Sequence, residues 1–443
     1  MKVKILVGLS AVILLSTDLL AAKVKTDELF AQSVSTLDIE GGKTFMSGRR
    51  EFIQTWAVPP DGGISTGLGP VFNRLACSSC HAKMGRGRSP NLPNERLASM
   101  LVRLSVEGEG EHGSPKPHPA YGLQLNEEGV DGVPGEATAS LEWSEKSFTY
   151  PDGSVANLRT PKLVLTNLHY GSMENTFTSL RVGQPMVGLG LLEAVSDSTL
   201  KEIAKKQKSI GLNGSFNRVW DIDKKEMVNG RFGFKANSPT LRQQIAEAFL
   251  GDIGITSPMF SEQQCTPKQV ECQKALMAKQ SPELTERRLH DVVFFVAHLA
   301  PPPQRDTKKS DVKRGKELFV KIGCAECHIP QLQTATHPLY PQTLPAQTIS
   351  PYTDMLLHDM GEGMSDGRRD FLATPRQWRT APLWGVGLIP IINGHSQYLH
   401  DGRARSLEEA ILWHGGESEP MKQKFTKLSK KERQEILAFL NSL

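Results

Sequence analysis

Two short cysteine motifs are the residues of this chain whose types and spacing point most directly to chemistry. Cys77–His81 (CSSCH) and Cys324–His328 (CAECH) both have the form C-x-x-C-H. Two thiols at this spacing can add to the two vinyl groups of a haem, and the imidazole that follows reaches the iron. A zinc site built from all four cysteines is the alternative, but zinc gives no reason for a histidine after both pairs. The sequence therefore predicts two covalently bound haem c groups, attached through Cys77, Cys80, Cys324 and Cys327, with His81 and His328 as proximal ligands.

The sixth coordination position of each iron decides whether a haem only carries electrons or also reacts. Three methionines could supply a thioether to the second haem, or could instead fill core and loop positions: Met355, Met360 and Met364. His112 and His118 follow the first motif, but the glycines and prolines around them are typical of solvated loops. The sequence leaves the sixth ligand of the N-terminal haem open.

His414 is a stronger candidate than the methionines for the second haem. Ser406-Leu407-Glu408-Glu409 is a capping box that predicts the start of a helix, and Gly415-Gly416 predicts its end. On such a helix His414 falls on the apolar face with Leu407 and Ile411. A lone histidine on an apolar face is more often a core residue than a ligand. We nevertheless expect this ring to point inward, where it can serve as an axial ligand.

The first residues are typical of an export signal. Lys2 and Lys4 begin a run that is mostly apolar, and Leu20-Ala21-Ala22 offers small residues for cleavage. The run is shorter than the roughly 20 apolar residues that a spanning helix needs. We therefore predict a signal peptide at residues 1–22, a periplasmic mature protein, and no stable membrane span after cleavage.

Cys265 and Cys272 are the two cysteines outside the haem motifs. In an oxidising compartment, neighbouring cysteines of this kind usually form a disulfide. A redox-active dithiol is the alternative, but the C-x₆-C spacing is wider than the spacing that tunes thiol pKa values. We expect a structural disulfide.

The organisation of the chain suggests two units. The stretch 301–310 is rich in proline and then charged, as in a stiff linker, and it separates residues 23–300 from residues 311–443. Each half has a haem motif early and an amphipathic helix last. The capping box Ser429-Lys430-Lys431-Glu432 predicts the start of the helix that ends the second half. We therefore expect a mainly α fold with two cytochrome c-like domains in tandem. A long loop-rich insertion, from about Ser89 to Ser281, enlarges the first domain and is expected to build a pocket over its haem.

The composition is that of an ordinary globular protein. The chain has 443 residues, of which 38% are hydrophobic and 23% charged, and its net charge is +4. No run of Lys and Arg approaches the basic stripe that nucleic-acid binding needs. We expect no nucleic-acid partner.

Several blocks beyond the motifs resemble a known family. They are residues 184–194 (QPMVGLGLLEA), 231–237 (RFGFKAN), 358–361 (HDMG), 379–385 (RTAPLWG) and 399–416 (LHDGRARSLEEAILWHGG). Together they resemble the di-haem oxidoreductase, putative peroxidase family over nearly the whole mature chain. More remotely, the C-terminal half is similar to bacterial di-haem cytochrome c peroxidases and to the enzyme that matures methylamine dehydrogenase.

The resemblance implies roles for particular residues. In those enzymes a His-Asp-Gly turn precedes the helix that bears the distal ligand of the C-terminal haem, and the matching residue here is His414. In the peroxidases a distal glutamate helps to break the O–O bond at the N-terminal haem. Its best match is Glu193, although the spacing before it differs, and an ordinary surface or helix-cap carboxylate is the alternative. The aromatic residue that bridges the haems has three candidates: Tyr170, Trp378 and Trp384.

The motifs and the resemblance together predict a peroxidase. A small redox donor protein would supply electrons through the C-terminal haem to the N-terminal haem, where peroxide or a similar small oxidant is reduced. The alternatives are an electron-transfer cytochrome without a substrate of its own, and haem-dependent oxidation of a partner protein. A calcium ion bound between the domains is a further candidate cofactor.

Overall fold

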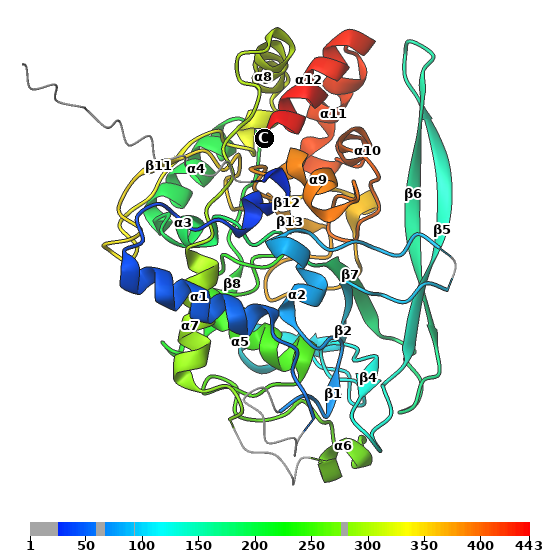
Figure 1. Cartoon of the computed structure of the whole chain (residues 1–443). Helices are drawn as coiled ribbons and strands as arrows, with labels where there is room; N and C mark the ends of the chain where they lie inside the picture. Colours follow the sequence, from blue (N-terminus) through cyan, green and yellow to red (C-terminus); the bar gives the residue numbers. More distant parts are fainter. Residues whose placement is uncertain (1–24, 59–66, 93, 276–281) are drawn as a thin grey trace, which may run out of the picture.

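The computed structural model describes residues 25–58, 67–92, 94–275 and 282–443 (Figure 1). The predicted signal peptide, residues 1–22, lies outside the described residues. Within the described part, none of the helices has the length and apolar character needed to cross a membrane.

Helices lie near both ends of the described chain. One helix contains the cysteines of the first motif, and another ends just before the second motif. In the first half they are α1 (Ile39–Ile53), α2 (Cys77–Cys80), α3 (Leu189–Glu193), α4 (Asp197–Ser209), α5 (Leu241–Ala248), α6 (Val270–Ala275) and α7 (Glu286–Ala297). In the second half they are α8 (Ser310–Ile322), α9 (Ile389–Asn393), α10 (Leu407–Leu412), α11 (Glu419–Thr426) and α12 (Lys430–Ser442).

The strands form small antiparallel sheets. β2 (Met100–Glu109) lies between β3 (Pro115–Lys116) and β7 (Phe177–Val182), and β5 (Thr138–Thr149) pairs with β6 (Val155–Thr166). The remaining strands form two-stranded pairs: β1 (Val71–Phe72) with β4 (Glu128–Gly129), β8 (Arg218–Asp221) with β9 (Glu226–Asn229), β10 (Leu332–Gln333) with β11 (Thr348–Ile349), and β12 (Leu357–Asp359) with β13 (Gln377–Arg379).

The expectation of a mainly α protein built from two cytochrome c-like domains is wrong. Helices account for only 34% of the structure and strands for 19%, distributed over many small sheets. The error arises in the stretch expected to be a loop-rich insertion. Met100, Val102 and Leu104 alternate along β2 and are buried, as period-two residues on one face of a strand should be. The glycines and prolines nearby mark turns between strands.

In each of two packed helix pairs, a glycine lies at the point of contact. α1 packs against α7 at Gly48, where an added Cβ would lie 1.8 Å from the carbonyl oxygen of Asp291. α8 packs against α12 at Gly315, where an added Cβ would lie 1.9 Å from the carbonyl oxygen of Glu435. Only a residue without a side chain allows the backbones to approach so closely.

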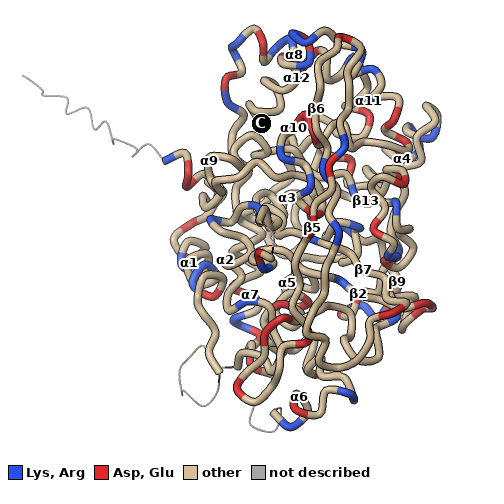
Figure 2. Tube along the Cα trace, turned by 90° about the vertical axis from the view of Figure 1, so that its right-hand side faces the viewer, with Lys and Arg blue, Asp and Glu red and all other residues tan. Residues whose placement is uncertain are grey.

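Other expectations about local structure are confirmed. Cys265 and Cys272 form a disulfide. The capping box at Ser429 and Glu432 begins α12, and the side chain of Ser406 caps α10. Residues of both charges, Lys and Arg as well as Asp and Glu, are interspersed along the described chain (Figure 2).

Candidate functional site

The second motif opens onto a cavity with mostly apolar walls. Cys324, Cys327 and His328 line it, directly after α8. The Nδ1 atom of His328 lies 2.9 Å from the carbonyl oxygen of Tyr352 and donates a hydrogen bond to it. This bond fixes the tautomer and leaves the lone pair of Nε2 available to a metal.

His414 lines the same cavity as His328. Its Nδ1 atom donates to the carbonyl oxygen of Ala410 at 2.8 Å, so its Nε2 atom is also available. Burial lowers the pKa of His414, and burial lowers the pKa of His328 to about 4. Both rings are therefore neutral imidazoles, the form in which histidine binds iron.

The methionine candidates are divided by the fold. Met360 and Met364 line the cavity of the second motif, whereas Met355 is buried in the core that surrounds α3 and α7. The hydroxyl oxygen of Ser418 lies 3.8 Å from the sulfur of Met360. His414 has its free nitrogen in a cavity that contains the other imidazole, so we retain it as the ligand candidate.

Two buried arginines also line this cavity. Arg86 donates through Nε to the carbonyl oxygen of Gln397 at 2.8 Å, and Arg379 donates through Nε to that of Gly233 at 2.9 Å. Within the described part of the chain, neither guanidinium forms an ion pair with a carboxylate. Burial lowers the pKa of each to about 10, so both remain cationic at neutral pH. Two such cations match the two propionates of a haem.

The histidine of the first motif, His81, is oriented like His328, with Nδ1 toward a backbone carbonyl oxygen. Cys77–Cys80 forms α2, and His81 donates from Nδ1 to the carbonyl oxygen of Gln184 at 2.7 Å. Burial lowers the pKa of His81. A Cβ at Gly183 would lie 2.7 Å from the carbonyl oxygen of Cys80, so the chain around Gln184 lies directly against the motif.

Glu193 has hydrogen-bond partners for both of its oxygens. Oε1 accepts from the backbone N–H of Leu241 at 2.8 Å, at the start of α5. Oε2 lies 3.0 Å from Nε2 of His337, whose Nδ1 accepts from Leu339 N–H, so Nε2–H is the donor to Glu193. The carboxylate therefore links α3, α5 and the loop at residue 337. Its role as an acid/base stays a prediction.

Asp252 is a carboxylate near the first motif that the sequence did not single out. Burial raises the pKa values of Cys77 and Cys80 to about 12, and the negative charge of Asp252 is the second largest cause. Burial raises the pKa of Asp252 itself to about 6, although Gln124 donates to its Oδ1 at 2.8 Å. The signal in the sequence was an acidic residue directly after the segment Phe249-Leu250-Gly251.

A match to a family model decides the identity of the chain. The model of the di-haem oxidoreductase, putative peroxidase family matches residues 25–443. The chain belongs to this family. A search of curated proteins found no match. Membership implies that the protein binds two haems, and the cysteines, imidazoles, apolar walls and arginines described above suit such groups.

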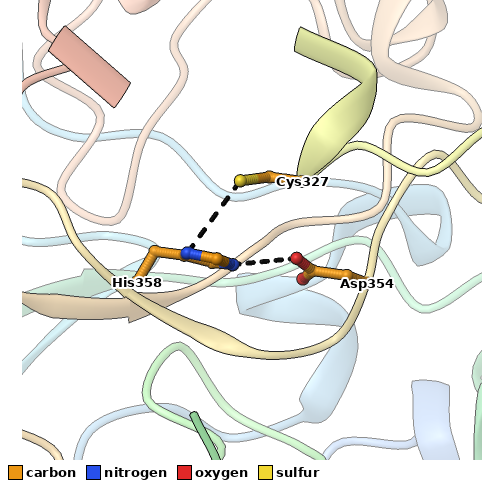
Figure 3. Close-up of side chains that lie close together, drawn as sticks. All are labelled: Cys327, Asp354 and His358. Atoms are coloured by element: carbon orange, nitrogen blue, oxygen red, sulfur yellow. Dashed lines mark hydrogen bonds and ion pairs between the residues drawn. The ribbon is translucent and has the colours of Figure 1, made fainter. Parts of the chain in front are cut away.

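The alternative zinc site does not form in this family member. Among the described residues, the one cluster of three or more metal-binding side chains is Cys327, Asp354 and His358 (Figure 3). The four motif cysteines therefore do not form such a cluster. His358 donates to Asp354 at 2.8 Å and to Glu417 at 3.0 Å. Burial alone would lower the pKa of His358, but these hydrogen bonds and one with Cys327 raise it to about 12. The ring is an imidazolium between two carboxylates, and an imidazolium cannot bind a metal.

Side chains connect the two sites of this di-haem oxidoreductase. Gln184 accepts from His81 through its backbone and from Arg379 through Oε1 at 3.3 Å, and both Gln184 and Arg379 line the second cavity. Trp384 also lines that cavity, and it packs against Gly188, where an added Cβ would lie 2.2 Å from the indole. The first and second sites are therefore neighbours.

The other histidine and aromatic candidates from the sequence are His112, His118, Tyr170 and Trp378, and only Trp378 among them lines the second cavity. His112 stacks on Trp220 with ring centroids 3.5 Å apart, and His118 accepts from the backbone N–H of Ala120. Tyr170 contacts Tyr121 in the core of the β2 sheet. Trp378 lines the second cavity and stacks on a neighbouring histidine ring at 3.8 Å.

Proposed function

We propose that this family member is an exported, periplasmic di-haem c peroxidase. Cys77, Cys80, Cys324 and Cys327 would attach the haems, and His81, His328 and His414 would bind iron. Hydrogen peroxide would be reduced at the N-terminal site with electrons that a small redox protein delivers to the C-terminal site.

A difference between the two sites carries this proposal. The second cavity contains two imidazoles, His328 and His414, each with Nε2 available. Near the first motif His81 has this orientation, while the two histidines expected as candidates, His112 and His118, have partners elsewhere. A site with two protein ligands suits electron transfer, and a site with one suits reaction with a small oxidant.

The protein must also handle protons. When bound, an iron with an open coordination position supplies the redox chemistry of peroxide reduction. Glu193 is the predicted acid/base, and Asp252 is the carboxylate close to the first motif. Gln184, Arg379 and Trp384 lie between the two sites and would hold them in a fixed relative position.

Carbon monoxide binding and peroxide turnover test the proposal together. The reduced holoprotein should bind one carbon monoxide per chain, at the N-terminal haem, and should consume peroxide with a reduced cytochrome as donor. Intact mass should show two haem additions. Absence of both carbon monoxide binding and peroxide consumption would contradict the proposal.

An electron-transfer cytochrome is the second candidate function. The hydrogen bonds of Glu193 to Leu241 and His337 favour it, because a carboxylate engaged in this way is a structural link. Two closed haems and no peroxide turnover are its expected signature.

A further inference from the structure

The β5–β6 hairpin is a large element that the proposed function does not use. Each strand has 12 residues, and they pair from Thr138 opposite Thr166 to Thr149 opposite Val155. The hairpin runs along one side of the molecule to the level of α10 and α12 (Figure 1). A two-stranded ribbon is at best marginally stable alone, so its position depends on what it packs against.

The tip of the hairpin docks on the second half of the chain. The buried Tyr150 donates its hydroxyl hydrogen to Glu408 of α10 at 2.8 Å. Arg433 of α12 donates to Asp152 at 2.8 Å, and its guanidinium lies 4.0 Å over the ring of Tyr150. The tip therefore contacts both helices.

Glu409 connects the middle of the hairpin to α10. This buried carboxylate accepts from the backbone N–H of Arg159 in β6 at 2.9 Å. Its other oxygen accepts from the backbone N–H of Arg405 at 2.8 Å. Arg159 also donates to the carbonyl oxygens of Arg403 at 3.0 Å and Gly402 at 3.1 Å. The hairpin thus holds both α10 and the turn before it.

The position of His414 depends on these contacts. α10 has only 6 residues, and so short a helix is not stable in isolation. His414 follows its last turn, and its ring is fixed by Ala410 of the same helix. The ammonium of Lys146 in β5 lies 4.9 Å over the ring of the preceding residue, Trp413.

We propose that the β5–β6 hairpin positions His414 and that Glu409 is the principal positioning residue. The hairpin holds α10 in the place from which the imidazole closes the second site. Loosening this contact would increase the fraction of molecules in which the C-terminal site is open. The inference rests on the axial role of His414 in the proposed function.

Carbon monoxide binding to the reduced holoprotein measures this opening. Glu409→Gln should raise the rate of binding at the C-terminal haem about tenfold, because a hydrogen bond to a charged acceptor is weakened. Tyr150→Phe, which loses only one hydroxyl, should raise it about threefold. The matched control is Glu142→Gln, whose side chain pairs with Lys162 on the exposed face of the hairpin. This control should bind carbon monoxide like the wild type.

His414→Gly separates failure of this inference from failure of the proposed function. If His414→Gly opens the C-terminal haem but Glu409→Gln and Tyr150→Phe bind carbon monoxide at the wild-type rate, the role of the hairpin is overturned and the proposed function stands. If His414→Gly leaves the spectrum unchanged, the axial role fails and the inference fails with it. Should Glu409→Gln not fold, Tyr150→Phe decides, since its buried ring is retained.

Discussion

In each half of the chain, a helix containing a glycine packs against the last helix of that half and delivers an aromatic ring to the motif histidine. Phe52 lies four residues after Gly48, and Phe319 lies four residues after Gly315. Both rings are 6.3 Å from the histidine of their motif, His81 or His328, at an interplanar angle of 52°. Each histidine also donates from Nδ1 to a backbone carbonyl. The proximal arrangement is therefore repeated almost without change.

The surroundings of the two motifs differ in the next elements. In the second half, α10 presents His414 to the cavity and the hairpin holds it. In the first half, α5 continues into a π-helix at Phe249–Ile253, which contains Asp252. Single turns of π-helix are often found at functional sites. The comparison indicates that the two motif histidines are held in the same way, by a phenylalanine ring and a backbone carbonyl. The elements farther from each motif differ, with α10 and His414 in one half and the π-helix with Asp252 in the other.

Replacement of His414 should have the largest effect. We expect His414→Gly to convert the C-terminal haem from a closed, low-spin state to an open, high-spin state, because one of its two axial imidazoles is lost. Absorption and electron paramagnetic resonance spectra measure the change. An unchanged spectrum would indicate Met360 or Met364 as the ligand and would weaken the contrast between the two sites.

Replacement of Glu193, the proposed acid/base, should have the next largest effect. Glu193→Gln is expected to reduce peroxide turnover by at least about tenfold, because proton transfer by a positioned group contributes 10² to 10⁴-fold. Both haems should stay attached, and the C-terminal potential should not change. Asp252→Asn is the comparison variant. A loss of turnover in that variant, with normal turnover in Glu193→Gln, would assign the acid to Asp252.

Alanine at the helix contacts tests whether the two proximal supports are equivalent. Gly48→Ala and Gly315→Ala should each lower the free energy of unfolding by about 1–3 kcal/mol, because the new methyl group meets a backbone carbonyl. Gly42→Ala in α1 is the control, since nothing lies within 4 Å of its added Cβ. It should raise the free energy of unfolding by about 0.5–1 kcal/mol. Denaturant titration measures all three, and unequal losses at positions 48 and 315 would show that the supports are not equivalent.

The pH dependence of stability should show an effect no larger than those of Gly48→Ala and Gly315→Ala, and it tests an ionised histidine beside the second motif. The pKa of His358 is raised to about 12, so its contribution to stability is complete below the ordinary pKa of histidine and is lost as the pH rises toward 12. Between pH 7 and 9 this one group should lower the free energy of unfolding by up to about 1.4 kcal/mol per pH unit. His358→Gln should have a flatter profile than the wild type. Equal slopes would mean that His358 is neutral in the folded protein.

Local sequence signals were reliable where one segment contained all the necessary information. The side-chain cap at Ser406 begins α10, and the capping box at Ser429 begins α12, because both depend on hydrogen bonds within one turn. The disulfide joins cysteines only 7 positions apart. The apolar pattern predicted that the ring of His414 would point inward, and the ring lines the cavity of the second motif, although α10 ends at Leu412 and not beside Gly415.

The region from β2 to β7 was expected to be rich in loops, but it forms strands. The turns of this region, such as residues 150–154 between β5 and β6, contain the glycines and prolines that suggested loops. Its strand β2 pairs with β7, which is far away in the sequence, as in Met100 with Val182. Pairing of this kind leaves a weak local signal, because packing against neighbouring strands contributes most of the preference of a residue for a strand.

The sequence alone determined that two C-x-x-C-H motifs, a candidate ligand at His414 and a disulfide would be present, since each depends on residue type and short spacing. Only the tertiary structure decided that Arg86, close to the first motif, lines the cavity of the second, that Glu193 pairs with His337, and that the β5–β6 hairpin holds Glu409. These contacts join residues more than a hundred positions apart. Such contacts form only when the whole chain has packed, because no local periodicity or spacing specifies which distant side chains will meet.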